Sequence, residues 1–150
     1  MKRLPGLREL SDDHHTGLVL ARSCKRAAQP DSELSPGEAW EEVRQAFSSR
    51  LEPHFQIEEQ HLLPALEAIG EAALAERIRA EHAALRDLRQ PVPATRASLQ
   101  RFGELLDAHI RYEERQVFEP TQHRLPQEAL QAIAAACHAV RYAAARPEER

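Results

Sequence analysis

Two short stretches of the chain each place a glutamate four residues after a histidine and end at a proline. They read HFQIEEQHLLP at residues 54–64 and HIRYEERQVFEP at residues 109–120. Four residues are about 40° round an α-helix and ~6 Å along it, so each pair can present a nitrogen and a carboxylate side by side. Such a pair can bind a metal ion, or it can be a surface pair worth a few tenths of a kcal/mol.

The apolar residues around these pairs predict that both pairs face a protein core. Phe47 lies seven residues before His54, and Phe102 lies seven residues before His109, so the pattern of phenylalanine, histidine and glutamate occurs twice. Apolar side chains that recur every three or four residues form the face that an amphipathic helix buries. Two further faces of this kind are each interrupted by one histidine. The histidines that interrupt the four faces are His14, His54, His82 and His109.

Histidines and glutamates that converge inside a core need a positive charge between them, because a buried carboxylate without a partner is costly. Taken singly, each histidine is better explained as a hydrogen-bonded core residue, but four faces with the same interruption favour a metal site. Imidazoles with a few carboxylates and no thiolate suit iron, manganese or zinc, and six ligands are too many for one tetrahedral zinc. The sequence therefore predicts two metal ions held by His14, His54, Glu58, His82, His109 and Glu113.

Two adjacent histidines compete for one of these positions. His14 has Leu7 and Ala21 one heptad away on its face, whereas His15 has arginines at the same distances. His14 is therefore the predicted ligand, and we expect His15 to support the site or lie at its rim.

Other polar residues lie close to Glu58 and Glu113 in the sequence. Glu59 and Glu114 lie about 100° round the helix from Glu58 and Glu113, which favours solvated positions. We nevertheless count both, with Glu81 and Tyr112, among the residues that support the ligands, and a distortion of the helix could exchange the two acids of each pair. His61 shares the face of Glu58. We expect His61 to support the ligands, with ligation as the alternative.

Breaks rich in proline and glycine divide the chain into predicted helices, and no strand pattern competes with them. Pro53 lies inside the second helix and predicts a kink or a local turn there. Short connections favour antiparallel neighbours. We therefore predict an all-α fold, an up-and-down antiparallel four-helix bundle over about residues 7–120 with an additional C-terminal helix packed outside it, in a single domain of residues 1–150. The predicted helices span residues 7–28, 37–68, 71–89, 94–118 and 126–145.

The composition excludes several other classes of protein. The net charge is -4 and no long basic block occurs, which argues against nucleic-acid binding. No apolar stretch approaches the ~20 residues needed to cross a bilayer. Cys24 and Cys137 lie far apart without the spacing of a disulfide scaffold. We expect a soluble, cytoplasmic protein without a nucleic-acid or membrane partner, as a monomer or homodimer.

The stretches DDHHTGL, HFQIEEQHLLP, AEHAAL and HIRYEERQVFEP, in this order, resemble the four signatures of the hemerythrin family in its bacterial HHE-type form. The resemblance covers about residues 7–120. It implies a four-helix bundle around a non-haem centre of two iron ions, with manganese or zinc as other metals that suit the site. The ligands that it implies are the same six residues, with Glu58 and Glu113 as bridges.

The sequence departs in two places from the oxygen-carrying members that it resembles. Those members have two histidines four residues apart on the third helix, whereas Ile78 and Arg86 flank His82 here. They also place an aspartate five residues after the last histidine, whereas this chain has glutamates four and five residues after His109. We therefore expect one metal ion to lack a nitrogen ligand or to use His15, His61 or Glu81.

Three functions from different classes fit these residues. The predicted function is binding of dioxygen, nitric oxide or peroxide at the dinuclear centre, for sensing, scavenging or iron handling. The alternative is a di-iron oxidase or peroxidase, for which Tyr112 and His61 are the only candidates for acid–base chemistry. A second alternative is a metal-free helical interaction module, which the charged residues on the apolar faces disfavour.

Overall fold

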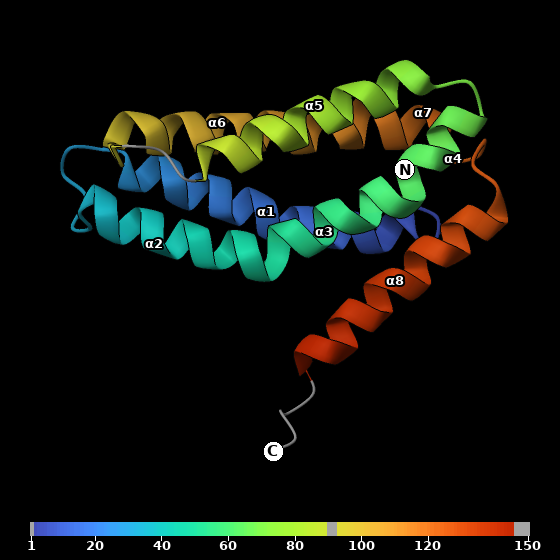
Figure 1. The fold of residues 1–150 in the computed structure, drawn as a ribbon, viewed down its shortest axis with the longest axis horizontal. Helices are drawn as coiled ribbons and strands as arrows, with labels where there is room; N and C mark the ends of the chain where they lie inside the picture. Colours follow the sequence, from blue (N-terminus) through green and yellow to red (C-terminus); the bar gives the residue numbers. More distant parts are fainter. Residues whose placement is uncertain (1, 90–92, 146–150) are drawn as a thin grey trace.

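All regular secondary structure in the described residues is helical, and Figure 1 shows the helices side by side. The computed structural model describes residues 2–89 and 93–145. The predicted all-α fold, an up-and-down four-helix bundle with a C-terminal helix, is confirmed. Its four parts are α1 (Leu7–Ala27), the run from α2 to α4, α5 (Ala72–Leu88), and the run from α6 to α7.

The second part of the bundle is one unbroken helical run with two widened turns. It comprises α2 (Pro36–Ala46), η1 (Phe47–Leu51), α3 (Glu52–Ile57), η2 (Glu58–Leu62) and α4 (Leu63–Ala68). Ser35 begins it, because its hydroxyl accepts a hydrogen bond from the Glu38 amide at 3.2 Å and its amide donates to the Glu38 carboxylate at 3.0 Å. The fourth part likewise comprises α6 (Arg96–Tyr112), η3 (Glu113–Phe118) and α7 (Glu119–Thr121).

Each widened turn is a π-helical segment that lies just before a proline. In η2 the amide of Leu63 donates to the carbonyl of Glu58, five residues earlier, instead of to the residue four earlier. Proline has no amide hydrogen, and its ring would collide with the carbonyl four residues earlier in an α-helix. The wider turns before Pro53, Pro64 and Pro120 accommodate the ring, so the helices continue where the sequence predicts a kink, a local turn or an end.

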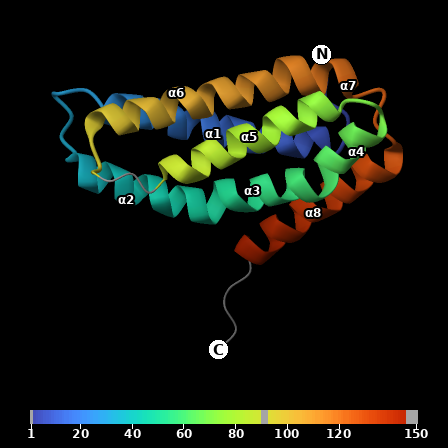
Figure 2. The same ribbon diagram turned by 45° about the horizontal axis from the view of Figure 1, so that its top comes forward.

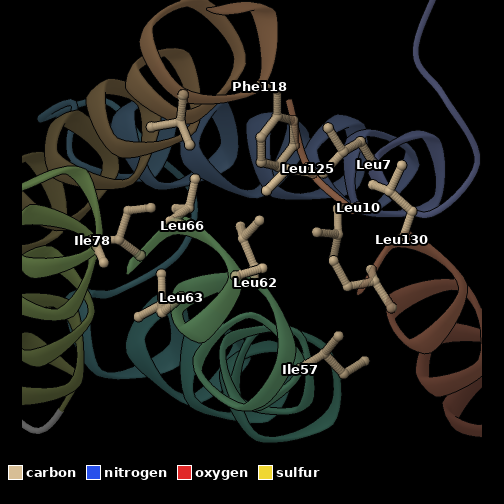
Figure 3. Packing of buried hydrophobic residues seen from close by; sticks show 14 of the residues in the cluster. Leu7, Leu10, Ile57, Leu62, Leu63, Leu66, Ile78, Phe118, Leu125 and Leu130 are labelled. Carbon is tan, nitrogen blue, oxygen red and sulfur yellow. The ribbon is translucent and has the colours of Figure 1, made fainter. Parts of the chain in front are cut away.

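Two hydrophobic clusters fill the bundle, one at each end. Leu10, Leu62, Ile78 and Phe118 belong to the first cluster, which Figure 3 shows. The second cluster, at the other end, is built around Trp40 and the aromatic and leucine side chains near it. Every part of the bundle passes from one cluster to the other, so each part crosses the layer between them once.

The C-terminal helix α8 (Gln127–Ala145) lies outside the bundle and leaves it at an angle (Figures 1 and 2). Leu130, Ile133 and Cys137 on this helix are buried in the first cluster. A β-carbon on Gly6, which has φ +93°, would lie 2.4 Å from the carbonyl oxygen of Leu130, so glycine permits this close contact with the start of α8. No helix of the described residues combines the length and the apolar character that crossing a membrane requires.

Candidate metal centre

The layer between the two hydrophobic clusters is polar. It contains all six residues predicted as metal ligands, and each of their side chains is exposed by 6 % or less. Each of the four parts of the bundle contributes one histidine, and the second and fourth parts each add the glutamate that opens a π-helical turn. The six residues are His14, His54, Glu58, His82, His109 and Glu113.

The first half of the centre contains the two N-terminal histidines. His14 Nε2 lies 2.8 Å from Glu113 Oε1 and 3.8 Å from Glu58 Oε2. His54 Nε2 lies 3.2 Å from the same Oε2 atom of Glu58. One atom of each of these four residues lies within 4.8 Å of the others.

The second half repeats this arrangement with the other two histidines. His82 Nε2 lies 3.1 Å from Glu58 Oε1, and His109 Nε2 lies 3.2 Å from Glu113 Oε2. Each glutamate thus offers one oxygen to each histidine pair, which is the disposition of a carboxylate that bridges two cations. Both halves contain two histidines, and among the described residues neither contains His15, His61 or Glu81, so these three do not make up the nitrogen that the sequence lacks relative to the oxygen-carrying members.

The outward nitrogen of every histidine in the centre is also held. Each Nδ1 atom lies 2.6–3.0 Å from a carboxylate oxygen, to which its hydrogen is donated because a carboxylate can only accept. A donating Nδ1 leaves the lone pair on Nε2, which points to the centre. The four pairs are His14 with Glu114, His54 with Asp13, His82 with Glu59, and His109 with Glu81.

These four pairs show an approximate two-fold repeat, in which each pair in one half of the chain corresponds to a pair in the other half. The acid that precedes a histidine binds a histidine on the next part of the bundle: Asp13 binds His54, and Glu81 binds His109. The second glutamate of each EE pair also binds a histidine of a neighbouring part of the bundle. Glu59 binds His82, and Glu114 binds His14. The repeat seen in the HxxxE stretches therefore extends to the hydrogen-bonding carboxylates.

Aromatic side chains restrict two of the imidazole rings further. Phe55 stacks on His82 with 3.9 Å between ring centroids and 15° between the planes. Phe118 stacks on His14 at 5.4 Å and 13°. Each of these two rings is thus fixed by its carboxylate and by an aromatic face.

The inward atoms of the centre lack hydrogen-bond partners. Among the described residues, the Nε2 atoms of the four histidines and both carboxylate oxygens of Glu58 and Glu113 are buried without a hydrogen bond. An unsatisfied buried polar group costs about 1–3 kcal/mol, and more when it is charged. Nitrogen and carboxylate donors without sulfur fit iron, manganese or zinc, and two cations would satisfy all of these atoms.

In the absence of a cation, protons balance the same charges. Burial alone would lower the pKa of His54, but the charge of Glu58 and the bond to Asp13 raise it to about 9. Burial likewise opposes protonation of His109, whereas the Glu113 carboxylate raises its pKa to about 10. Burial would raise the pKa of Glu58, but the surrounding histidines hold it well below its usual range. The centre is therefore built for positive charge between its carboxylates.

Comparison with protein-family models gives a match to the hemerythrin HHE cation-binding domain over residues 6–121. The chain belongs to the hemerythrin HHE cation-binding family. Neither a curated protein nor a solved structure matches the sequence closely enough to count as similar. The matched residues contain all six members of the candidate centre, so the family and the buried histidines and glutamates together indicate a metal-binding site.

Other residues that the sequence singled out occupy varied positions in this hemerythrin-like bundle. His15 is exposed, and His61 is partly buried outside both groups of ligand atoms. Tyr112 is buried in the first hydrophobic cluster beneath the guanidinium of Arg77, 3.8 Å from its ring centroid. Glu59 and Glu114 are only partly exposed, and each bonds a histidine of the centre, so they support the ligands instead of pointing freely into solvent.

One residue of this layer was not predicted from the sequence. Asp13 bonds His54, although Asp13 adjoins His14 in the chain. The available signal was a second repeat, because an acid directly precedes a histidine at Asp13-His14 and again at Glu81-His82.

A cleft of about 590 Å³ leads from the surface to one side of the centre. His14, His54 and His109 lie at its inner end, and His82 is not among its lining residues. Its walls come from α1, α2, η1, α3, α6 and α8, and they are largely apolar. The cleft is far larger than a diatomic molecule requires and falls in the range of sites for small organic molecules.

Proposed function

We propose that this hemerythrin-family protein holds two iron ions and binds dioxygen, nitric oxide or peroxide at them, for sensing, scavenging or iron handling. The proposed ligands are the Nε2 atoms of four histidines and the four carboxylate oxygens of Glu58 and Glu113. The observation that carries the proposal is that these eight inward atoms are buried together without hydrogen bonds. Manganese and zinc suit the same donors, but zinc cannot change its oxidation state when such a ligand binds, whereas iron and manganese can.

The chain's own residues would set the properties of this centre. The bridging carboxylates would hold two cations close together, and the Nδ1 bonds would keep each imidazole neutral and oriented. The hydrophobic clusters exclude water from the two ends of the polar layer, and the cleft would give a small ligand a route to the metal ions.

The first test is the metal content of the purified protein together with its optical spectrum in air. We expect about two irons per chain and an absorption band of a bridged iron pair. His54→Ala and His109→Ala should each lower the metal content and also the thermal stability that metal confers, because binding and folding are linked. His15→Ala and His61→Ala are matched controls outside both ligand groups. Equal metal content in all four variants and the native protein would refute the proposed ligands.

A second candidate function, a peroxidase that oxidises an organic substrate, is favoured by the cleft. Its inner end reaches three of the proposed ligands, and apolar residues such as Leu51, Leu106 and Ile110 line it. An aromatic molecule with one hydroxyl group fits such a site. Peroxide would accept two electrons and two protons from two phenol molecules, which yields two water molecules and two phenoxyl radicals.

Peroxide-dependent oxidation of 4-methoxyphenol by the iron-loaded protein tests this candidate. Ala46→Trp would narrow the cleft at a lining residue away from the proposed ligands. We expect the oxidation rate to fall at least about tenfold in this variant while the iron content stays at the native level. Equal rates in variant and native protein, or no oxidation by either, would exclude the peroxidase.

A further inference from the structure

We propose that four arginines position the four histidines of the metal centre by fixing the carboxylates that lie between them. The inference rests on the proposed function, because it concerns histidines whose Nε2 atoms would bind the metal ions. Every carboxylate that accepts an Nδ1 hydrogen also accepts a hydrogen bond from a different arginine. The four relays are Arg3–Glu114–His14, Arg141–Asp13–His54, Arg86–Glu59–His82 and Arg77–Glu81–His109.

The relay through Arg86 has the most complete geometry. Its Nη1 donates to Glu59 Oε2 at 2.8 Å and its Nη2 to Glu59 Oε1 at 3.1 Å, so both oxygens of this carboxylate are held. Glu59 Oε2 in turn lies 2.7 Å from His82 Nδ1. The same guanidinium holds Glu52 through Nε at 2.9 Å and Nη2 at 2.8 Å. Arg86 is therefore locked between two carboxylates, of which only Glu59 touches a histidine of the centre.

The relay through Arg3 is its counterpart in the other half. Arg3 donates to Glu114 Oε1 at 3.2 Å and to the Glu114 carbonyl oxygen at 2.8 Å. The other oxygen of Glu114 accepts from the Ser11 hydroxyl at 2.7 Å and from His14 Nδ1 at 2.6 Å. The Arg3 side chain is exposed by only 13 %, so this ion pair is less screened by solvent than a surface pair.

The arginines of the other two relays are more exposed, and each donates one hydrogen bond to its carboxylate. Arg77 Nε donates to Glu81 Oε2 at 3.0 Å. Arg141 Nη2 donates to Asp13 Oδ1 at 3.3 Å and to the Glu9 carbonyl oxygen at 3.0 Å. The approximate two-fold therefore pairs the two relays whose arginines are less exposed, Arg3 and Arg86, and the two whose arginines are more exposed, Arg77 and Arg141.

Two of the arginines lie outside the residues that define the family match. Arg3 precedes residue 6, and Arg141 lies on α8 beyond residue 121. The segments before and after the bundle thus each supply one guanidinium group. Each guanidinium reaches, through its carboxylate, a different histidine in the first half of the centre. This is a task for the C-terminal helix in addition to its packing against the first hydrophobic cluster.

The relay acts by holding each carboxylate in one orientation. A carboxylate held by a guanidinium presents a fixed oxygen to the Nδ1 hydrogen, and the Nε2 lone pair then points to the metal. Without the arginine, the carboxylate can rotate away, and the imidazole loses its fixed direction. Loss of a group that hydrogen-bonds a metal ligand lowers metal affinity about 10–100-fold, and an arginine one bond further out should fall near the lower figure.

Zinc affinity, measured by competition with a chromogenic chelator, tests the strongest relay. We expect Arg86→Gln and Glu59→Gln each to weaken zinc binding by about tenfold. Glu52→Gln is the matched control, because it breaks the other ion pairs of Arg86 and leaves the relay intact. Arg79→Gln is a second control, since Arg79 pairs with Glu67 and Glu76. The structure gives neither of these glutamates a contact with a histidine of the centre.

A redox titration separates positioning from a general loss of stability. The midpoint potential of the iron-loaded protein should shift in Arg86→Gln and Glu59→Gln and stay at the native value in both controls. Arg86→Lys should recover only part of the affinity, because an ammonium cannot hold both oxygens of Glu59 in a fork. If Arg86→Gln fails to fold, Arg77→Gln tests the exposed relay through Glu81 with the same measurements.

The outcomes distinguish this inference from the proposed function. Native protein that binds no metal would refute both. Native protein that binds metal, with affinities and potentials unchanged in the relay variants, would refute the relays alone. An equal loss in Glu52→Gln would show that Arg86 acts through helix packing, which would also overturn the inference.

Discussion

At the scale of single residues, the centre uses both nitrogens of each histidine. Nδ1 is committed to a carboxylate on another part of the bundle, and Nε2 faces the two central glutamates. A surface i,i+4 pair needs neither feature, because its imidazole and carboxylate can satisfy each other or water. The doubly held imidazole is therefore what separates a metal centre from a set of buried ion pairs.

The residue scale carries a prediction about pH, because metal ions and protons compete for the same atoms. The pKa values of about 9 for His54 and about 10 for His109 mean that both rings are protonated at pH 7 in the metal-free protein. A raised pKa gives stability that is complete below the usual value near 6.5 and is lost as the pH rises through the raised value. Metal-free protein should thus become less stable as the pH rises from 6.5 to 9. Over the same range, protons compete less strongly with metal ions for the histidine nitrogens.

The gain in melting temperature on adding zinc should therefore grow between pH 6.5 and 8.5. Thermal unfolding with and without zinc at each pH measures it, and weakly buffered calorimetry should detect protons released on binding. His15→Ala serves as the control, since this exposed residue should leave the pH profile unchanged. A gain that is constant across this range would contradict protonated histidines in the metal-free centre.

The six central residues were predictable from the sequence because helical periodicity places them on buried faces. The carboxylates that hold them were harder to predict, since their partners lie on other helices. Glu59 and Glu114 seemed solvated on an ideal helix, yet each reaches a histidine across a helix interface. The arginines of the relays had no sequence signal, because a surface arginine within reach of an acid is common in any helical protein.

At the scale of elements, the bounds of the helices could be predicted from capping residues and helix breaks in the sequence, whereas the π-helical turns could not. The predicted helix of residues 71–89 corresponds to α5 (Ala72–Leu88), and that of residues 126–145 to α8 (Gln127–Ala145). The break between the predicted helices of residues 71–89 and 94–118 lies partly outside the described residues. Proline at position 53 predicted a kink or a local turn, but the helix absorbs the ring by widening the turn before it.

The π-helical turns also act on the site, because two of them begin at the central glutamates. η2 starts at Glu58 and η3 at Glu113, and a proline follows each segment after one intervening residue. A widened turn changes the direction of the residues within it relative to an ideal helix. This explains how two consecutive glutamates both contribute to the centre. The carboxylate of the first lies inside it, and the carboxylate of the second bonds a histidine of another helix.

At the scale of the whole molecule, the polar layer is stable because hydrophobic clusters close it at both ends and α8 covers part of one side. The first cluster holds α8 through Ile133, which is fully buried, and the cleft wall includes Cys137 and Val140 of the same helix. The C-terminal helix thus bounds the route to the centre and supplies one arginine relay. Its docking is a property of the complete chain and not of the four-helix bundle alone.

A pair of glycine substitutions tests that docking. Gly6 and Gly70 both have positive φ, 93° and 88°, so alanine at either position incurs backbone strain. Gly6 also has ψ -65°, outside the left-handed helical region that L-residues can adopt. Only at Gly6 would the new β-carbon meet the Leu130 carbonyl at 2.4 Å, whereas nothing lies within 4 Å at Gly70. We expect Gly6→Ala to lower the free energy of unfolding by about 1–3 kcal/mol more than Gly70→Ala, because α8 must shift to relieve the overlap and the backbone at residue 6 is strained. Urea denaturation measures the difference, and equal losses in the two variants would show that α8 does not rest against residue 6 as described.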